Sequence, residues 1–298
     1  EIFPINFSGI NCVDYTKSIT IRPKLGATGL SISTSTQYTL DLENAKRVII
    51  DGRPAGNGTV SELTISNTHN LGSAIRFVNN ASNDTLQYLN IRGAAQNGII
   101  GAVTTYDTVG VVKFGKSVTG IGCDSNMIYR CNIFDATTTT PGTLIYAEGG
   151  VNKVNHNNAI VECNLYNFFQ QSNNSYGVLI KEYNDKWMIS NNSFYQTSSR
   201  NYVLSTYTPG VFCIKLETSL YGGFEINGNS LGGSLPNTAG SISNLTGNFV
   251  FTAINASNAY LINWPGKVHH NVIKNLSLSP VSNIAQHTAI SLGNANAN

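Results

Sequence analysis

The chain has 298 residues, of which 41% are hydrophobic and 11% charged, and its formal net charge is +2. This balance excludes a charge-rich disordered chain. The scattered Lys and Arg give no case for nucleic acid or an anionic membrane as a partner. The longest apolar runs fall short of the 18 residues that a membrane span needs, so the sequence predicts no membrane insertion.

Residues 18–67 contain short β-prone runs that follow one another closely and are separated by turn residues. The runs cover 18–21, 30–33, 38–42, 47–50 and 63–66. The chain shows no amphipathic helix pattern of useful length. We interpret this region as the first two or three coils of an all-β repeat protein.

From residue 73 a unit of two strands recurs six times, and its second strand contains two apolar anchor residues five positions apart. The anchors are Leu86/Ile91, Ile128/Ile133, Ile160/Leu165, Ile189/Phe194, Ile226/Leu231 and Val268/Ile273. Residues an odd number apart on a straight strand point to opposite faces, so a bend must separate the two anchors for both to face one interior. An Asn follows each first anchor by three or four residues, and we expect it to supply the left-handed corner. These residues are Asn90, Asn132, Asn164, Asn192, Asn229 and Asn271. Their amides are also expected to stack as an internal Asn ladder.

The first strand of each unit precedes the cornered strand, at 74–77, 111–114, 144–146, 178–181, 211–215 and 249–252. Successive first anchors are 42, 32, 29, 37 and 42 residues apart, which is typical of a solenoid with two or three strands per coil. Loops absorb the variation at 137–142, 170–176, 197–209 and 232–247. The sequence therefore predicts one parallel β-helix domain over 1–298. It divides into N-terminal coils (1–72), six regular coils (73–276) and the start of a further coil (277–298).

The run 288–293 matches the first strand of a further coil whose cornered strand is missing, so we expect a longer polypeptide or another element to cover this end. Residue 1 is a Glu with no initiator Met or signal peptide before it, and we interpret the chain as a mature or excised piece.

Five runs of the sequence resemble the β-helix regions of large secreted surface proteins of Bacteroidetes that are exported by the type IX secretion system. They lie at 18–23, 48–54, 74–77, 192–197 and 229–234, and the resemblance extends in order from about residue 5 to residue 293. It implies a right-handed, single-stranded, pectin-lyase-like parallel β-helix that is secreted to the cell surface. It implies no catalytic residues.

Five cysteines occur, at 12, 123, 131, 163 and 213. Cys131 and Cys163 occupy the same position in successive units, so we expect them to be small inward-facing residues stacked between coils. A disulfide between them stays an alternative. No CxxC or Cys/His spacing indicates a metal site.

Many parallel β-helices are polysaccharide lyases or hydrolases, but this sequence does not favour an enzyme. Hydrolysis needs clustered carboxylates, and the eight Asp are dispersed without an Asp-Asp pair. Asp51-Gly52-Arg53 is interpreted as a turn. Because adjacent residues on a strand point opposite ways, His269-His270 is not expected to bind metal. The sequence predicts no catalytic residue, no metal and no cofactor.

One candidate binding strip is predicted along the rod. Its members are Arg76, Lys113, Lys181, Glu182 and Lys215, with Tyr129, Arg130 and Trp187 on neighbouring cornered strands. Equivalent positions should stack about 4.8 Å apart, and long polar and aromatic side chains suit an extended sugar chain. The alternative is an ordinary column of solvated residues.

Three functional hypotheses follow. We expect an extracellular structural or adhesive module of a larger bacterial surface protein, which contacts polysaccharide or cell-surface glycan and further domains of the same polypeptide. The alternatives are a carbohydrate-active enzyme with an unrecognised site, and a passive spacer rod. Fold alone does not choose among them.

Overall fold

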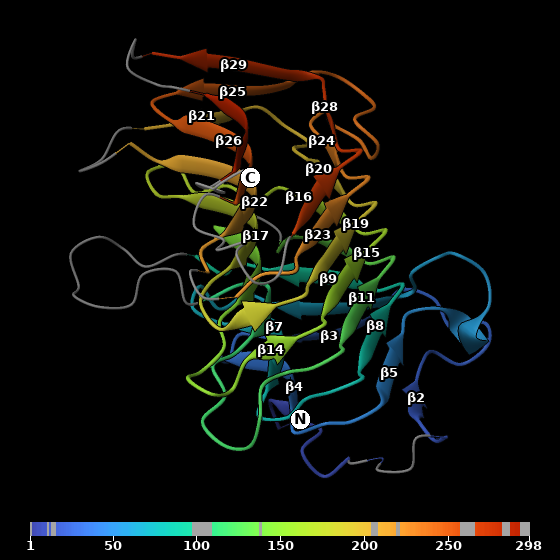
Figure 1. The fold of residues 1–298 in the computed structure, drawn as a ribbon. Helices are drawn as coiled ribbons and strands as arrows, with labels where there is room; N and C mark the ends of the chain where they lie inside the picture. Colours follow the sequence, from blue (N-terminus) through green and yellow to red (C-terminus); the bar gives the residue numbers. More distant parts are fainter. Residues whose placement is uncertain are drawn as a thin grey trace.

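A computed structural model describes residues 2–10, 12, 16–96, 109–136, 139–203, 208–218, 221–256, 266–281 and 287–292. Three long sheets of parallel strands run along the described part of the chain. Eight successive coils contribute one strand to each sheet, and the last described strand adds a ninth to the first sheet. The predicted all-β parallel β-helix is confirmed. Figure 1 shows the coils stacked in chain order, from the N-terminal strands to the last ones.

The first sheet contains β1 (Ile5–Asn6), β4 (Tyr38–Glu43), β7 (Ser73–Val78), β10 (Val112–Phe114), β13 (Thr143–Ala147), β17 (Ser175–Ile180), β22 (Gly210–Leu216), β26 (Val250–Ala256) and β30 (Thr288–Leu292). The second contains β2 (Ile19–Ile21), β5 (Val48–Asp51), β8 (Thr85–Gln87), β11 (Met127–Tyr129), β15 (Ala159–Val161), β19 (Met188–Ser190), β23 (Glu225–Asn227) and β27 (Lys267–His269). The third contains β3 (Leu30–Thr34), β6 (Leu63–Asn67), β9 (Asn90–Gly93), β12 (Asn132–Asp135), β16 (Asn164–Tyr166), β20 (Ser193–Tyr195), β24 (Ser230–Leu231) and β28 (Val272–Ile273).

Two smaller sheets lie in the connections. β14 (Asn155–His156) pairs with β18 (Asn184–Asp185), and β25 (Ser243–Gly247) pairs with both β21 (Arg200–Tyr202) and β29 (Leu276–Pro280). A short 3₁₀ turn, η1 (Pro54–Gly56), follows β5. β21 and β25 fall in segments that the sequence predicts as variable loops, so some of those loops carry an additional parallel strand.

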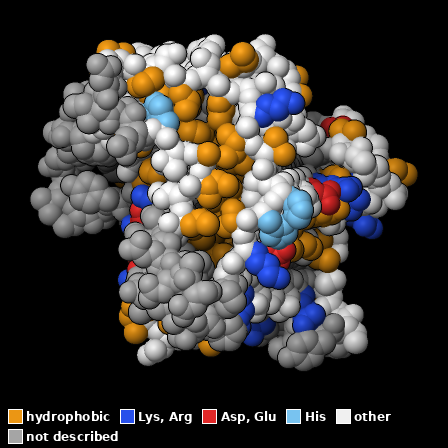
Figure 2. Space-filling view, turned by 45° about the horizontal axis from the view of Figure 1, so that its top comes forward, with side chains coloured by type: hydrophobic (Ala, Val, Ile, Leu, Met, Phe, Trp, Pro, Cys, Tyr) orange, Lys and Arg blue, Asp and Glu red, His pale blue; other side chains and the backbone are white. Residues whose placement is uncertain are grey.

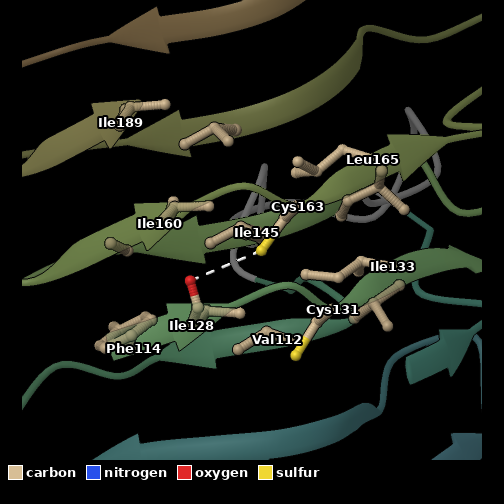
Figure 3. Packing of buried hydrophobic residues seen from close by; sticks show 14 of the residues in the cluster. Val112, Phe114, Ile128, Cys131, Ile133, Ile145, Ile160, Cys163, Leu165 and Ile189 are labelled. Carbon is tan, nitrogen blue, oxygen red and sulfur yellow. Dashed lines mark hydrogen bonds between the residues drawn. The ribbon is translucent and has the colours of Figure 1, made fainter. Parts of the chain in front are cut away.

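The six predicted anchor pairs form two columns inside the rod. Ile128, for example, pairs with Leu86 on one side and Ile160 on the other, and Ile133 pairs with Ile91 and Leu165. Ten of the twelve anchors are no more than 1% exposed, whereas Val268 and Ile273 of the last coil are partly buried. Figure 3 shows five of the anchors, Ile128, Ile133, Ile160, Leu165 and Ile189, stacked between successive coils. The inward assignment of the anchors is confirmed.

The corner between the second and third sheets is made by a residue in the left-handed conformation, but it is not the predicted Asn. The residues with positive φ are Tyr88, Arg130, Glu162, Asn191, Gly228 and His270. Each lies one or two positions before the Asn named above, which has an ordinary φ. The expectation that those Asn supply the left-handed corner is therefore wrong. Three of the six corner residues, Tyr88, Arg130 and Glu162, are not types that favour positive φ, so the stacked coils impose it there.

The corner Asn instead form two ladders on opposite sides of the backbone. Asn229 is fully buried, and its Nδ2 donates to the Ile189 carbonyl at 2.8 Å and to Asn271 Oδ1 at 2.9 Å. Asn192 donates to Asn229 Oδ1 in the same way. The predicted internal ladder is confirmed for Asn192, Asn229 and Asn271. The other three form a separate, half-buried ladder, in which Asn164 donates to Asn132 and Asn132 to Asn90.

All five cysteines are free. Cys131 and Cys163 are fully buried and occupy the inner-ladder position, where the Cys163 amide donates to Asn192 Oδ1 at 2.9 Å. The Cys163 thiol donates to the Ile128 carbonyl at 3.5 Å, as Figure 3 shows. The prediction of small inward-facing residues stacked between coils is confirmed.

Candidate ligand-binding ridge

The predicted strip on the first sheet is only partly a column. Lys113 pairs in register with Arg76 and with Tyr146, and Leu179 pairs with Tyr146 and Lys215. Lys181 lies two residues beyond Leu179, in the next column. The structure therefore brings Arg76, Lys113 and Lys215 into one column and leaves Lys181 outside it.

The charges on this sheet are used within the protein. Arg76 donates to the buried Asp41 through Nε and Nη2, at 2.9 and 2.5 Å, and lies over the Tyr38 ring. Lys215 Nζ lies 2.5 Å from Glu217, and Lys181 Nζ lies 3.9 Å from the same carboxylate. Burial, together with the charge of Arg76, lowers the pKa of Lys113. Arg76 and Lys181 therefore lie beside carboxylates of neighbouring coils, and Lys215 pairs with one on its own coil, so these three side chains are not free charges.

The aromatic rings on the outer side of the first sheet offer little surface to a ligand. Tyr146, Tyr176 and Phe212 are 1%, 0% and 9% exposed. Lys215 Nζ lies 4.6 Å from the Phe212 ring centroid. Glu182 is half-buried, and its backbone carbonyl accepts hydrogen bonds from Gly149 and Asn184.

Trp187 lies inside the core. It is 0% exposed, and its ring packs edge-to-face on Phe114 at 4.8 Å. A sugar outside the rod cannot stack on it, so its place in the predicted strip is corrected. The sequence holds a signal for this placement, since Trp187 precedes the anchor Ile189 by two positions and an even spacing keeps both on one face.

The remaining candidates, Tyr129 and Arg130, lie at the corner between the second and third sheets. Arg130 donates from Nε to Glu162 at 2.6 Å and from Nη1 to the Tyr88 hydroxyl at 2.7 Å. Its guanidinium lies 5.0 Å from the centroid of the Tyr129 ring. The Arg130 and Glu162 side chains are 41% and 38% exposed, so this cluster is accessible to solvent.

The cluster continues into the coil containing Arg53, which donates two hydrogen bonds to Asp51 at 2.9 and 2.8 Å and lies over the Tyr88 ring at 4.0 Å. Gln87 also donates to Asp51, at 2.9 Å. We call Arg53, Gln87, Tyr88, Tyr129, Arg130 and Glu162 the corner ridge. It spans four successive coils and alternates guanidinium, aromatic and carboxylate groups.

Asp51-Gly52-Arg53 adopts the predicted turn, since Asp51 Oδ1 also accepts the Arg53 amide at 3.0 Å. A Cβ on Gly52 would lie 1.8 Å from the Tyr88 carbonyl, so only glycine fits there.

A second cluster was missed at the sequence level. Asp124, His156 and Asp185 lie on three successive coils, just before the strands β11, β15 and β19 of the second sheet. His156 Nδ1 lies 2.5 Å from Asp185, and the His156 amide donates to Asp124 at 3.0 Å. Burial raises the pKa of Asp124, and its hydrogen bond from His156 opposes this. We call these residues the acidic column. The signal was present, because each residue precedes a first anchor by four positions.

A cavity of about 330 Å³ lies in the last coil, between Phe251, Ile273, Leu276 and Leu278. It is bordered by His287, whose Nδ1 accepts the Phe251 amide at 3.1 Å. Figure 2 shows hydrophobic side chains in a stripe across this end of the molecule, where Val272, Ile290 and Leu292 are 48%, 41% and 55% exposed. Three of the residues that line the cavity, Ile273, Leu276 and Leu278, are partly buried and pack against the core.

No family model, curated protein or solved structure matches this chain. Among the described residues, no helix is long and apolar enough to cross a membrane.

Proposed function

We propose that the protein is an extracellular structural and adhesive rod that binds polysaccharide along the corner ridge. The observation that carries this proposal is the arrangement of Tyr129, Arg130 and Glu162, which are partly exposed and lie on two adjacent coils about 4.8 Å apart. The ridge offers donors, acceptors and an aromatic ring in a line, which is what an extended sugar chain requires.

The contacts within the ridge hold its groups in place before a ligand arrives. Arg130 is held between Glu162 and the Tyr88 hydroxyl, so it loses little side-chain freedom on binding. The guanidinium keeps further donors for sugar hydroxyls or uronate carboxylates. The first sheet lacks this combination, because the rings beside its cations, Tyr146, Tyr176 and Phe212, are buried.

Secretion by the type IX route and an origin in a larger bacterial surface protein are part of the same proposal. They rest on the sequence resemblance alone. Size-fractionated cell-surface material probed with an antibody to the rod would test this location.

The binding proposal is tested with a panel of acidic and neutral polysaccharides and three variants. In Tyr129→Val, the tyrosine is replaced by the residue type at the equivalent position of the next coil, Val161. In Arg130→Asn, the arginine is replaced by a residue type that tolerates the left-handed backbone of the corner. Each is expected to weaken binding of the retained polysaccharide about tenfold, or about 1.4 kcal/mol. Lys116→Ala removes an exposed cation just after β10, away from the ridge, and should leave binding unchanged. Equal binding by all variants would overturn the ridge assignment.

A second candidate function, a carbohydrate-active enzyme, is favoured by the acidic column. Asp124 and Asp185 lie two coils apart, roughly 9.6 Å by the strand spacing, near the upper limit of about 9.5 Å for inverting glycosidases. Their environments differ, since burial raises the pKa of Asp124, whereas Asp185 Oδ1 lies 2.5 Å from His156 Nδ1.

The same panel tests the enzyme candidate when polymer size is followed by chromatography. If the enzyme candidate holds, the polymer shortens with the parent and Asp185→Asn reduces the rate at least a hundredfold. Intact polymer that co-elutes with the protein supports the adhesive rod. Intact polymer that elutes separately leaves the passive spacer.

A further inference from the structure

Two consecutive histidines at the end of the second sheet face each other across the corner. His269 is the last residue of β27, and His270 occupies the left-handed corner position with φ 56°. Their Nδ1 atoms lie 2.6 Å apart, with the ring planes at 81°. On a straight strand these side chains would point to opposite faces, so the expectation that they diverge is wrong. The corner conformation brings them together.

A carboxylate lies at the other nitrogen of His269. Glu225 Oε1 is 3.7 Å from His269 Nε2 and accepts a hydrogen bond of 3.0 Å from Asn227. Both residues belong to β23, which pairs directly with β27. A carboxylate at Nε2 favours the proton on that nitrogen and leaves the Nδ1 lone pair directed toward His270. Proteins orient metal-binding imidazoles in this way.

From this geometry we propose that His269 and His270 chelate a divalent transition-metal cation through their two Nδ1 atoms, while Glu225 positions His269. Zn²⁺, Cu²⁺ and Ni²⁺ are the cations that prefer imidazole nitrogen. Zn–N bonds of about 2.0–2.1 Å in a tetrahedral site place two ligand nitrogens roughly 3.3 Å apart. The imidazoles therefore need only a small rotation to admit the ion.

The site supplies two protein ligands, and water completes the coordination. Among the residues that the structure describes, no group of three or more His, Cys, Asp or Glu is arranged to hold a metal. His270 is exposed and the His269 side chain is 40% exposed, so the ion has direct access from solvent. Lys267 lies on the same strand and its charge opposes a cation, which argues for a modest affinity.

Calorimetric titration of untagged protein with Zn²⁺ alone tests the proposal, with Cu²⁺ absorption spectra as a second readout. The parent is expected to bind one ion per chain, more weakly in acid because imidazole ligands must be deprotonated. His270→Asn, which tolerates positive φ, should weaken binding at least tenfold. Glu225→Gln should weaken it by up to about tenfold.

His156→Asn serves as the matched control, because it removes the other histidine that lies beside a carboxylate. It should leave the titration unchanged, and circular dichroism should show that every variant is folded. Retention of full Zn²⁺ affinity by His270→Asn would overturn the proposal, as would loss of binding in His156→Asn.

Discussion

Replacing Ile160 by Asp is expected to prevent folding of the rod or to cause its aggregation. Ile160 is 0% exposed and pairs in register with Ile128 and Ile189, so the new carboxylate would lie between two apolar residues. An isolated charge in such a site costs several kcal/mol, and the lost burial of the Ile side chain adds roughly 2 kcal/mol or more. Together these approach the whole stability of a typical domain, about 5–15 kcal/mol.

The neighbouring Val161→Asp provides the control, because Val161 lies on the same strand but points outward and is half-buried. Its expected cost is under about 1 kcal/mol. Far-UV circular dichroism, thermal melting and size-exclusion chromatography would compare the two proteins. If Ile160→Asp unfolded at the same temperature as the parent protein, the inward assignment of the anchor columns would be wrong.

The inward position of the anchors could be predicted because their spacing in the sequence restricts the path of the backbone. Two apolar residues five apart face one interior only if the chain bends between them, and six repetitions of the pattern leave few architectures. The residue that makes the bend could not be predicted in the same way. Tyr88, Arg130 and Glu162 have no strong preference for positive φ, and they adopt it because the coils above and below fix the backbone.

The candidate strip was predicted less well, because residue type says little about pairing. From the sequence alone Arg76 is interpreted as an unpaired cation, because its partner Asp41 lies 35 positions earlier in the chain. Leu179 and not Lys181 pairs with Lys215 in the column. The two candidates are two positions apart and point to the same face, so only the strand register decides between them. Counting from the anchors would have placed Trp187 inside the core and revealed the acidic column.

Asp84→Asn is expected to stabilise the protein above pH 7 and to remove a pH dependence from its stability. Asp84 is fully buried at the head of a third ladder, formed with Asn126 and Asn158. Asp84 Oδ1 accepts the Val48 amide at 2.8 Å, whereas Oδ2 has no hydrogen-bond partner. Burial raises the pKa of Asp84 to about 7, and the Val48 hydrogen bond opposes this only in part.

The ladder explains why this oxygen prefers a proton. In the next coil, Asn126 Nδ2 donates to the Ala81 carbonyl at 2.9 Å, and one coil further on Asn158 Nδ2 donates to the Cys123 carbonyl at 2.8 Å. Oδ1 of Asp84 accepts the Val48 amide just as Oδ1 of Asn126 accepts the Asp84 amide. We therefore infer that Oδ2 of Asp84 takes the place of the Nδ2 donor, where it needs a hydrogen. An Asn at position 84 supplies the missing donor without a charge.

The sign of the pH effect follows from the direction of the shift. The unfolded chain loses the Asp84 proton near its ordinary pKa of 3.8 and the folded chain near 7, so the folded state binds more protons between these values. Stability from this group is complete below about pH 4, falls as the pH rises, and levels off above about pH 7. The total loss is roughly 4 kcal/mol.

Urea denaturation at pH 5 and pH 8 measures this effect, since the parent should lose about 3 kcal/mol between the two and Asp84→Asn should lose far less. Asp51→Asn is a control in which the pKa of the replaced carboxyl is shifted in the opposite direction. Burial alone would raise the pKa of Asp51, but hydrogen bonds from Arg53 and Gln87 outweigh it and lower the pKa. That variant should therefore be less stable than the parent at both pH values. Parallel pH profiles for the parent and Asp84→Asn would mean that the ladder tolerates an ionised carboxylate, and the assignment of a proton to Oδ2 would fail.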